Sequence, residues 1–216
     1  MQYIYAPGCA LMSYKPHLAE KLKEIITKEY GEMETLLTCC FNKPKLSKDT
    51  YIITPCVTCA ERYSKDSECS TLFFLTKLAE SKDFPFPDYG GIPMSIQDTC
   101  SARKNPEVLS TIRRLLERMN INLIEPEHTG EKARCCGQIF YGKLETSKVE
   151  TQMKNRADEM PCNDVVVYCA SCIISMTVGG KRPRYILDLL FNEPTDMTGM
   201  GADKWNKTLC EFRNTH

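Results

Sequence analysis

The feature that most constrains this chain is a pattern of cysteines that occurs twice. Each copy has a single cysteine, then two adjacent cysteines, then a Cys-x-x-Cys motif. The first copy is Cys9, Cys39, Cys40, Cys56 and Cys59, and the second is Cys100, Cys135, Cys136, Cys169 and Cys172. Between the copies, residues 81–93 contain three prolines and two adjacent glycines, which exclude a helix or a central strand. The chain is therefore interpreted as a tandem duplication.

The duplication predicts how the chain is divided. We expect a first repeat over residues 1–80, a linker over 81–93, a second repeat over 94–191 and a C-terminal tail over 192–216. The tail begins with many Gly, Pro, Thr and Met residues, so we expect it to be irregular there. Its end, around Trp205, is expected to be solvated.

The number of cysteines indicates what they are for. Thirteen of the 216 residues are cysteine, which is several times the ordinary usage and an odd number that cannot pair completely within one chain. With 42% hydrophobic residues, a chain of this length builds a core without disulfides. The amino terminus has no basic residue before Lys15, so we expect no signal peptide and a cytoplasmic protein. In that reducing compartment, many cysteines indicate thiolates that bind metal or perform redox chemistry.

Charge and hydropathy exclude two classes of partner. The 28 basic and 28 acidic residues give a formal net charge of zero, so the chain has no excess positive charge to attract nucleic acid. The longest stretch without a charge, residues 165–180, is shorter than the roughly 20 apolar residues that span a bilayer. We therefore expect neither nucleic-acid binding nor membrane insertion.

Local patterns place the cysteines at one edge of an α/β fold. Short apolar runs at residues 3–5, 51–53 and 165–168 predict strands that are covered on both faces, as in a parallel sheet. Apolar residues at helical spacing predict helices around Leu18–Ile26 and Val108–Met119, the second one beginning at Asn105-Pro106-Glu107. The single cysteines and both Cys-x-x-Cys motifs fall where a strand ends and a helix begins, which is the ligand-binding edge of open α/β sheets.

Five sulfurs in each repeat favour a centre with several metal atoms. A tetrahedral zinc site uses four ligands, commonly two Cys-x-x-Cys pairs, whereas each repeat has only one such pair. Adjacent cysteines point in different directions, which suits a cluster in which they reach different irons. Thiolates also match iron–sulfur clusters in softness. The Cys-rich run typical of bacterial ferredoxins does not occur in the sequence.

These residues carry a family resemblance over roughly residues 1–190. The segments Tyr5-Ala6-Pro7-Gly8-Cys9, Asp98-Thr99-Cys100 and Cys135-Cys136-Gly137, with the two Cys-x-x-Cys motifs, resemble the cysteine-rich CCG-domain family, best known from the B subunit of heterodisulfide reductase. The resemblance implies an α/β fold of two pseudo-symmetric CCG lobes with parallel, Rossmann-like sheets. It also implies one or two noncubane [4Fe-4S] clusters per chain, each held by five cysteines, with the adjacent pair providing bridging thiolates.

The resemblance further implies an activity and partners. Such a protein is an iron–sulfur oxidoreductase that reduces a small disulfide or related sulfur substrate to thiols. The sequence has no nucleotide fingerprint such as G-x-G-x-x-G and no cubane cluster motif, so its electrons must come from a partner. That partner is expected to be an electron-donating flavoprotein or a ferredoxin-like iron–sulfur subunit.

The two repeats are not equivalent. Between the adjacent pair and the Cys-x-x-Cys motif, the second repeat has 32 residues and the first has 15, too few for a strand and a crossover helix. The first repeat has Phe41 where the second has Gly137. We therefore expect either a more exposed first cluster or a degenerate first site, with two clusters favoured over one and the second repeat the stronger site.

Other residues have weaker assignments. His128, a few residues before Cys135, is the candidate proton donor to departing thiolates, although a loop histidine is commonly just solvated. Gly137 is expected to line the space beside the cofactor. The cysteines outside the repeated pattern are interpreted as buried small hydrophobic residues; they are Cys69, Cys162 and Cys210.

Two alternatives remain at this point. The chain can be a non-catalytic iron–sulfur protein for electron transfer, sensing or cluster assembly. It can also be a thiol-disulfide enzyme with bare cysteines, using Cys56 and Cys59 as a thioredoxin-like pair, or a structural zinc protein. Iron and sulfide analysis separates these classes, because zinc alone would favour the structural reading.

Overall fold

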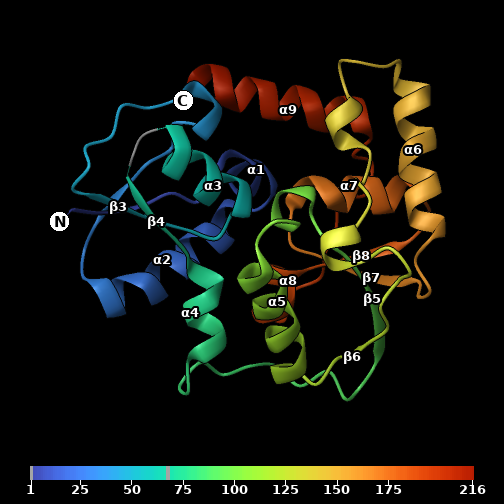
Figure 1. Ribbon diagram of the computed structural model, residues 1–216, viewed down its shortest axis with the longest axis horizontal. Helices are drawn as coiled ribbons and strands as arrows, with labels where there is room; N and C mark the ends of the chain where they lie inside the picture. Colours follow the sequence, from blue (N-terminus) through green and yellow to red (C-terminus); the bar gives the residue numbers. More distant parts are fainter. Residues whose placement is uncertain (1, 67–68) are drawn as a thin grey trace. The chain divides into compact units, whose positions relative to one another are not determined.

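Two four-stranded sheets organise the chain, and each belongs to a separate unit (Figure 1). The structure is a computed structural model that describes residues 2–66 and 69–216. The first unit comprises the chain up to Lys77 together with Thr208–His216, and the second unit is Leu78–Lys207.

The first unit alternates strands and helices. Its elements are β1 (Gln2–Tyr5), α1 (Cys9–Tyr14), α2 (Pro16–Tyr30), β2 (Glu34–Thr35), the 3-10 turn η1 (Cys40–Asn42), β3 (Thr50–Thr54), α3 (Val57–Asp66), β4 (Ser70–Phe73) and α4 (Phe74–Glu80), which runs on into the second unit. Residues 43–49 form no helix, so β2 and β3 are joined without a crossover helix, as the short spacing predicts.

The second unit has the same plan with a longer middle section. Its elements are β5 (Pro93–Gln97), η2 (Cys100–Ala102), α5 (Pro106–Arg118), β6 (Asn122–Leu123), η3 (Gly130–Lys132), η4 (Gln138–Phe140), α6 (Thr146–Asp158), β7 (Asp164–Val167), α7 (Ala170–Val178), β8 (Arg182–Tyr185) and α8 (Ile186–Leu190). In the predicted connector, residues 81–93, residues 81–92 contain neither helix nor strand, whereas Pro93 already begins β5. Asn105 caps α5 by accepting a hydrogen bond from the Val108 amide, as its sequence predicts.

The two sheets share strand order and register. The first runs β2-β1-β3-β4 and the second β6-β5-β7-β8, and all pairings are parallel. Tyr5 pairs with Ile53 in the first sheet, and Ile96 pairs with Val166 in the second. The single cysteines, Cys9 and Cys100, lie four residues after Tyr5 and Ile96. The Cys-x-x-Cys motifs begin three residues after the paired Ile53 and Val166. The predicted α/β fold with two pseudo-symmetric parallel sheets is confirmed.

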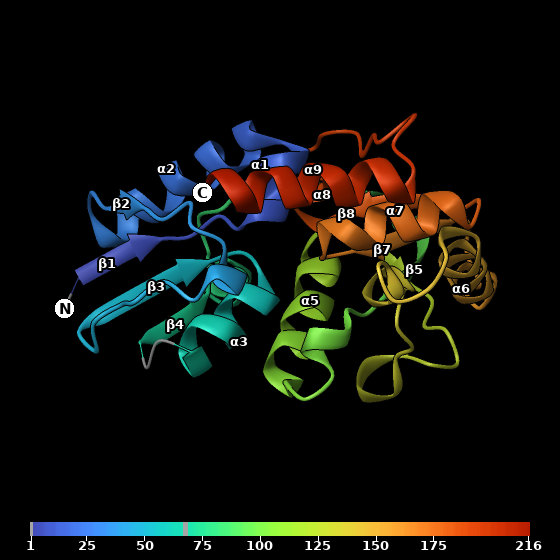
Figure 2. The ribbon, with the colours of Figure 1, turned by 90° about the horizontal axis from the view of Figure 1, so that it is seen from above.

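Helices cover both faces of each sheet. From β1 to β2 the chain moves toward one edge of the sheet, and from β3 to β4 it moves toward the other edge. Because both crossovers are right-handed, α2 and α3 lie on opposite faces of the sheet (Figure 2). The same holds for α5 and α7 in the second unit. The central strands are accordingly buried on both sides: Ile52, Ile53 and all three valines of β7 are fully buried. This burial explains why these strands read as continuous apolar runs.

The C-terminal tail differs from its prediction. Residues 192–201 are irregular, as expected, but Ala202–Thr215 form helix α9, and Trp205 is fully buried instead of solvated. The indole nitrogen of Trp205 donates a hydrogen bond to the hydroxyl of Ser171 at 3.0 Å. The helix begins within the second unit and ends within the first. In the parts of the chain that the structure describes, no helix has both the length and the apolar composition needed to cross a membrane.

Candidate metal centres

The single cysteines and Cys-x-x-Cys motifs lie at the carboxyl edge of the central strands. Cys9 begins α1 directly after β1, and Cys56 immediately precedes α3. In the second unit, Cys100 begins η2 after β5, and Cys169 caps the amino terminus of α7. This is the strand-to-helix position that the sequence predicts, where backbone amides and the helix dipole stabilise negative charge.

All five sulfurs of the first set converge. The Sγ atoms of Cys39 and Cys9 are 3.6 Å apart, and those of Cys59 and Cys40 are 3.7 Å apart. Cys56 completes the set through a hydrogen bond with Cys59. The structure therefore brings together five thiols from three separate chain segments.

Gly8 permits one of these close approaches. Its φ of 85° lies in the region that favours glycine. A Cβ atom at this position would lie 3.2 Å from the Sγ of Cys59 and 3.4 Å from the Cβ of Cys56. A side chain would thus press on the Cys-x-x-Cys motif, so glycine lets the turn after β1 pass beside it.

The second set repeats the same chain of sulfur contacts. Its thiols shift the pKa of one another in the order Cys100, Cys135, Cys136, Cys172 and Cys169. The corresponding order in the first set is Cys9, Cys39, Cys40, Cys59 and Cys56. In both sets the single cysteine comes first, the adjacent pair follows, and the Cys-x-x-Cys motif comes last. Both predicted sets are therefore assembled with the same connectivity.

The protonation pattern is also the same in both sets. The first cysteine of each adjacent pair, Cys39 or Cys135, has a pKa well below the ordinary value because its two sulfur neighbours hydrogen-bond to its thiolate. The second cysteine, Cys40 or Cys136, has its pKa raised to about 12 by its hydrogen bond to the first. The buried thiols thus do not ionise together by themselves. A bound metal is the kind of group that deprotonates several adjacent thiols at once.

The sulfur of Cys169 lies at the amino terminus of a helix and beside a hydroxyl group. Hydrogen bonds from Cys172, from the backbone amides at the start of α7 and from the Thr99 hydroxyl lower the pKa of Cys169 to about 7, although burial opposes the shift. Of the second set, this thiol is the one at the N-cap of a helix, and it ionises near neutral pH.

The spacing of the sulfurs fits a centre with more than one metal atom. Two thiolates on one tetrahedral metal with bonds of about 2.3 Å lie roughly 3.8 Å apart. The two Sγ pairs of the first set, at 3.6 Å and 3.7 Å, come close to that separation. Among the described residues, no group of three or more His, Cys, Asp or Glu side chains is arranged to hold one metal ion.

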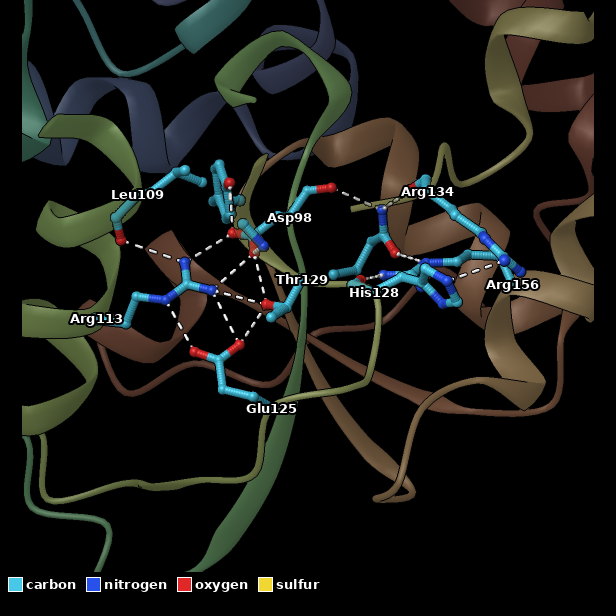
Figure 3. Close-up of polar contacts among 11 residues, drawn as sticks. Asp98, Leu109, Arg113, Glu125, His128, Thr129, Arg134 and Arg156 are labelled. Carbon is cyan, nitrogen blue, oxygen red and sulfur yellow. Dashed lines mark hydrogen bonds and ion pairs between the residues drawn. The ribbon is translucent and has the colours of Figure 1, made fainter. Parts of the chain in front are cut away.

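A buried carboxylate connects the segments of the second set (Figure 3). Asp98, whose side chain is fully buried, accepts hydrogen bonds from both terminal nitrogens of Arg113 at 2.8 Å and 2.7 Å. It also accepts from the Tyr168 hydroxyl at 2.8 Å, the Gly130 amide at 2.7 Å and the Thr129 hydroxyl at 3.1 Å. Burial alone would raise the pKa of Asp98, but these donors, led by Arg113, lower it. The carboxylate is therefore charged and fully satisfied.

A second buried network surrounds Arg156. Its side chain is only 2% exposed; Nε donates to the Gln97 side-chain oxygen at 2.5 Å, and Nη1 pairs with Glu159 at 2.5 Å. Nη2 donates to the backbone oxygen of His128 at 2.9 Å. Gln97 in turn donates to the backbone oxygens of Asp98 and Arg134. This network holds the end of β5 against the loop that leads to Cys135.

His128 belongs to the rim of this network. Its Nε2 atom lies 3.0 Å from a terminal nitrogen of Arg134 (Figure 3). Its Nδ1 atom lies 3.4 Å from the carboxylate of Glu159 but makes no hydrogen bond to any described residue, and the role of His128 as proton donor stays a prediction.

Gly137 has a packing reason for being glycine. Its φ is 101°, and a Cβ atom there would lie 2.9 Å from the Cγ of Met153 and 3.1 Å from the Met153 amide nitrogen. Met153 belongs to α6, so Gly137 lets this helix approach the segment after Cys136. Its contact with a cofactor stays a prediction.

The first unit has an aromatic residue at the corresponding place. Phe41 is 47% exposed, and the guanidinium groups of Arg62 and Arg213 lie 4.0 Å and 4.5 Å from its ring centre. The Asn42 side chain donates to the backbone oxygen of Arg213 at 2.9 Å, and the Arg213 side chain hydrogen-bonds to Cys9. The end of α9 therefore lies against the first cysteine set.

The other cysteines remain outside both sets. Cys69 is buried and its thiol donates to the backbone oxygen of Tyr63 at 3.4 Å, which confirms the prediction for this residue. The prediction is wrong for Cys210, which is exposed on α9, and Cys162 is only partly buried. The sequence patterns did not indicate the polar residues that support the two sets, which include Asp98, Arg113, Arg156 and Arg213. The available signal for Asp98 was its position as a charged residue directly after a buried strand.

Comparison with known proteins places part of the chain in a described family model. Residues 94–177 match the family model described as the cysteine-rich domain CCG. The match runs from β5 into α7 and contains all five cysteines of the second set. No curated protein matches the chain.

Proposed function

We propose that this chain is an iron–sulfur oxidoreductase, starting from the match of its residues 94–177 to the cysteine-rich domain CCG. A CCG domain with many cysteines suggests iron–sulfur binding. The observation that carries the proposal is that two units assemble the same five-cysteine arrangement, with the same order of sulfur contacts. Chance burial of single cysteines would not produce the same connectivity twice.

Each set would hold one noncubane [4Fe-4S] cluster. The ligands would be the ten cysteines of the two sets, with both members of each adjacent pair as bridging candidates, as the family resemblance implies. Such a cluster supplies electrons and an iron that can accept a further sulfur ligand. The polypeptide supplies the sulfur ligands, amides at helix amino termini and the exclusion of water around Cys59 and Cys172, both buried.

The reaction would be the reduction of a small disulfide. The S–S bond breaks, two electrons from a partner enter, and two protons complete the two product thiols. The partner would be an electron-donating flavoprotein or a ferredoxin-like iron–sulfur protein. His128, whose ring contacts Arg134 and Glu159, is the candidate for donating a proton to a departing thiolate.

Metal analysis of protein purified without oxygen tests the cofactor. With both sets filled, we expect about eight irons and a similar amount of acid-labile sulfide per chain, and about four if only the second set is filled. Zinc in place of iron, or no iron after anaerobic reconstitution with iron and sulfide, would contradict the proposal.

A second measurement tests the reaction. The reduced, reconstituted protein is mixed with a small disulfide, and the absorption and electron paramagnetic resonance spectra are followed while free thiols are counted. We expect two thiols per disulfide consumed and a change in the cluster spectrum. Clusters that are redox-active but unaffected by any disulfide or thiol would favour electron transfer without a bound substrate.

A further inference from the structure

We propose that Asp98 is a positioning residue that holds the three chain segments of the second cysteine set in register before any cofactor binds. The proposal rests on the proposed function for the identity of the cofactor. The positioning itself is a property of the polypeptide and can be measured without metal.

Asp98 first fixes the segment to which it belongs. It follows β5 directly and lies two residues before Cys100. Its side chain is fully buried. A buried carboxylate is costly unless its oxygens are fully hydrogen-bonded, so its partners must be present for this turn to form. The position of Cys100 is thereby coupled to those partners.

The second segment reaches Asp98 through Tyr168. The Tyr168 hydroxyl donates to Oδ1 of Asp98 at 2.8 Å, and both side chains are buried. Tyr168 follows β7 and immediately precedes Cys169, the N-cap of α7. This single hydrogen bond therefore relates the start of the Cys-x-x-Cys motif to the turn that bears Cys100.

The third segment reaches Asp98 through the loop before the adjacent pair. The Gly130 amide and the Thr129 hydroxyl donate to Oδ2 at 2.7 Å and 3.1 Å, and this loop continues to Cys135. Arg113 of α5 supplies the balancing charge to Asp98 and also pairs with Glu125 at 3.0 Å. The loop is thus anchored at Thr129 and Gly130, six and five residues before Cys135.

One carboxylate therefore contacts all three segments that carry the second set. Holding them together before binding removes part of the ordering cost that a cofactor would otherwise meet. The first unit lacks this device, because the same register positions hold Pro7 instead of Asp98 and Pro55 instead of Tyr168.

The test compares Asp98→Asn and Tyr168→Phe with the wild type in two arms. In the metal-free arm, each full-length protein is treated anaerobically with iodoacetamide, and the alkylation rate of every cysteine is measured by peptide mass spectrometry. We expect Asp98→Asn to raise the rates of the second set at least tenfold and to leave those of the first set unchanged. Tyr168→Phe should raise mainly the rates of Cys169 and Cys172, by a few-fold.

In the second arm, the proteins are reconstituted with iron and sulfide and the release of iron to a chelator is timed. We expect the wild type to release iron in two kinetic phases and Asp98→Asn to lack one of them. The measurement is made at a temperature at which circular dichroism shows that the fold of the variant is intact. If Asp98→Asn does not fold, Tyr168→Phe, which removes one hydroxyl only, decides the question in both arms. Unchanged alkylation rates in the folded variants would overturn the positioning role. Absence of iron in the wild type would instead overturn the proposed function and leave the metal-free arm valid.

Discussion

The two units build the same sulfur constellation with different supports. In the second unit, a crossover helix and a buried polar network surround the cysteines. In the first unit, no crossover helix follows the adjacent pair, and the end of α9 contacts this segment from 171 positions away in the sequence. The shared feature is the strand register. The position of the sulfurs is therefore set by the sheet, and the surrounding residues can change as long as they hold the loops.

The residues that precede the cysteines show how far the supports differ. Gln97, Asp98 and Thr99 of the second unit all make polar contacts within the site. The first unit has Ala6, Pro7 and Gly8 at these places. Gly8 works by the absence of a side chain, which lets the backbone approach Cys59. One unit thus positions its turn by hydrogen bonds and the other by close backbone packing.

The largest expected difference concerns the adjacent cysteine pairs. Replacing Cys135 and Cys136 with Ala should remove about four irons per chain and destabilise the second unit, because a metal bound only by the folded state contributes its binding energy to folding. Replacing Cys39 and Cys40 should also remove iron but lower the thermal unfolding midpoint less, since the buried Asp98 carboxylate that links the segments of the second set is replaced by Pro7 in the first. Iron analysis and calorimetry measure both effects.

Cys162→Ala serves as the control, because Cys162 lies outside both sets. It should leave the iron content unchanged. Equal losses of iron and of thermal stability from the two pairs would show that the shorter repeat is as strong a site as the longer one.

The next largest effect concerns the residue after each adjacent pair. Gly137→Ala should destabilise the second unit by about 2–4 kcal/mol, from the strained left-handed backbone and the pressure on Met153. Phe41→Ala should cost about 1 kcal/mol, because Phe41 is half exposed and loses only its contacts with two guanidinium groups. Urea unfolding of both variants decides the comparison. Similar losses would mean that α6 can shift away from Gly137.

A smaller effect is expected at Arg213. Arg213→Gln removes the positive charge that hydrogen-bonds to Cys9, so iron held by the first set should be lost to a chelator several-fold faster. Iron in the second set should be retained as in the wild type. Arg114→Gln, which removes an arginine 4.0 Å from Glu80 at the surface of the second unit, is the matched control. Faster loss from both sets would indicate general destabilisation.

The smallest effect lies at one matched strand position. Asp164 pairs with Arg182 across β7 and β8, where the first unit has Tyr51 opposite Ser70. Arg182 lowers the pKa of Asp164, so the pair stabilises the fold at pH values above the ordinary pKa of 3.8, and this stabilisation is lost as the pH falls through the lowered value. Asp164→Asn should cost about 0.5 kcal/mol at pH 7, given solvent screening. The cost should be smaller at pH 3 than at pH 7, as measured by urea unfolding. A loss that is the same at both pH values would exclude the ion pair as its cause.

Much of the candidate site could be predicted from the sequence because it depends on local patterns. A short apolar run that ends in Cys56, or in Cys169, marks a strand end, and parallel strands bring their carboxyl ends to one edge. The duplicated order of cysteines then indicates which sulfurs belong together. The absence of a crossover helix between β2 and β3 also followed from chain length alone.

What the sequence by itself determined is therefore the fold class, the membership of the two sulfur sets and their place at the sheet edge. Only the tertiary structure decided how the loops are held. Asp98 meets Tyr168 across 70 positions and Asn42 meets Arg213 across 171, and no periodicity relates such residues. The same is true of Gly137, whose requirement comes from a helix that packs against it, and of Trp205, buried by the Ser171 contact. Periodic patterns report how a segment is buried, whereas the partner of a single polar side chain is chosen by packing between segments distant in sequence.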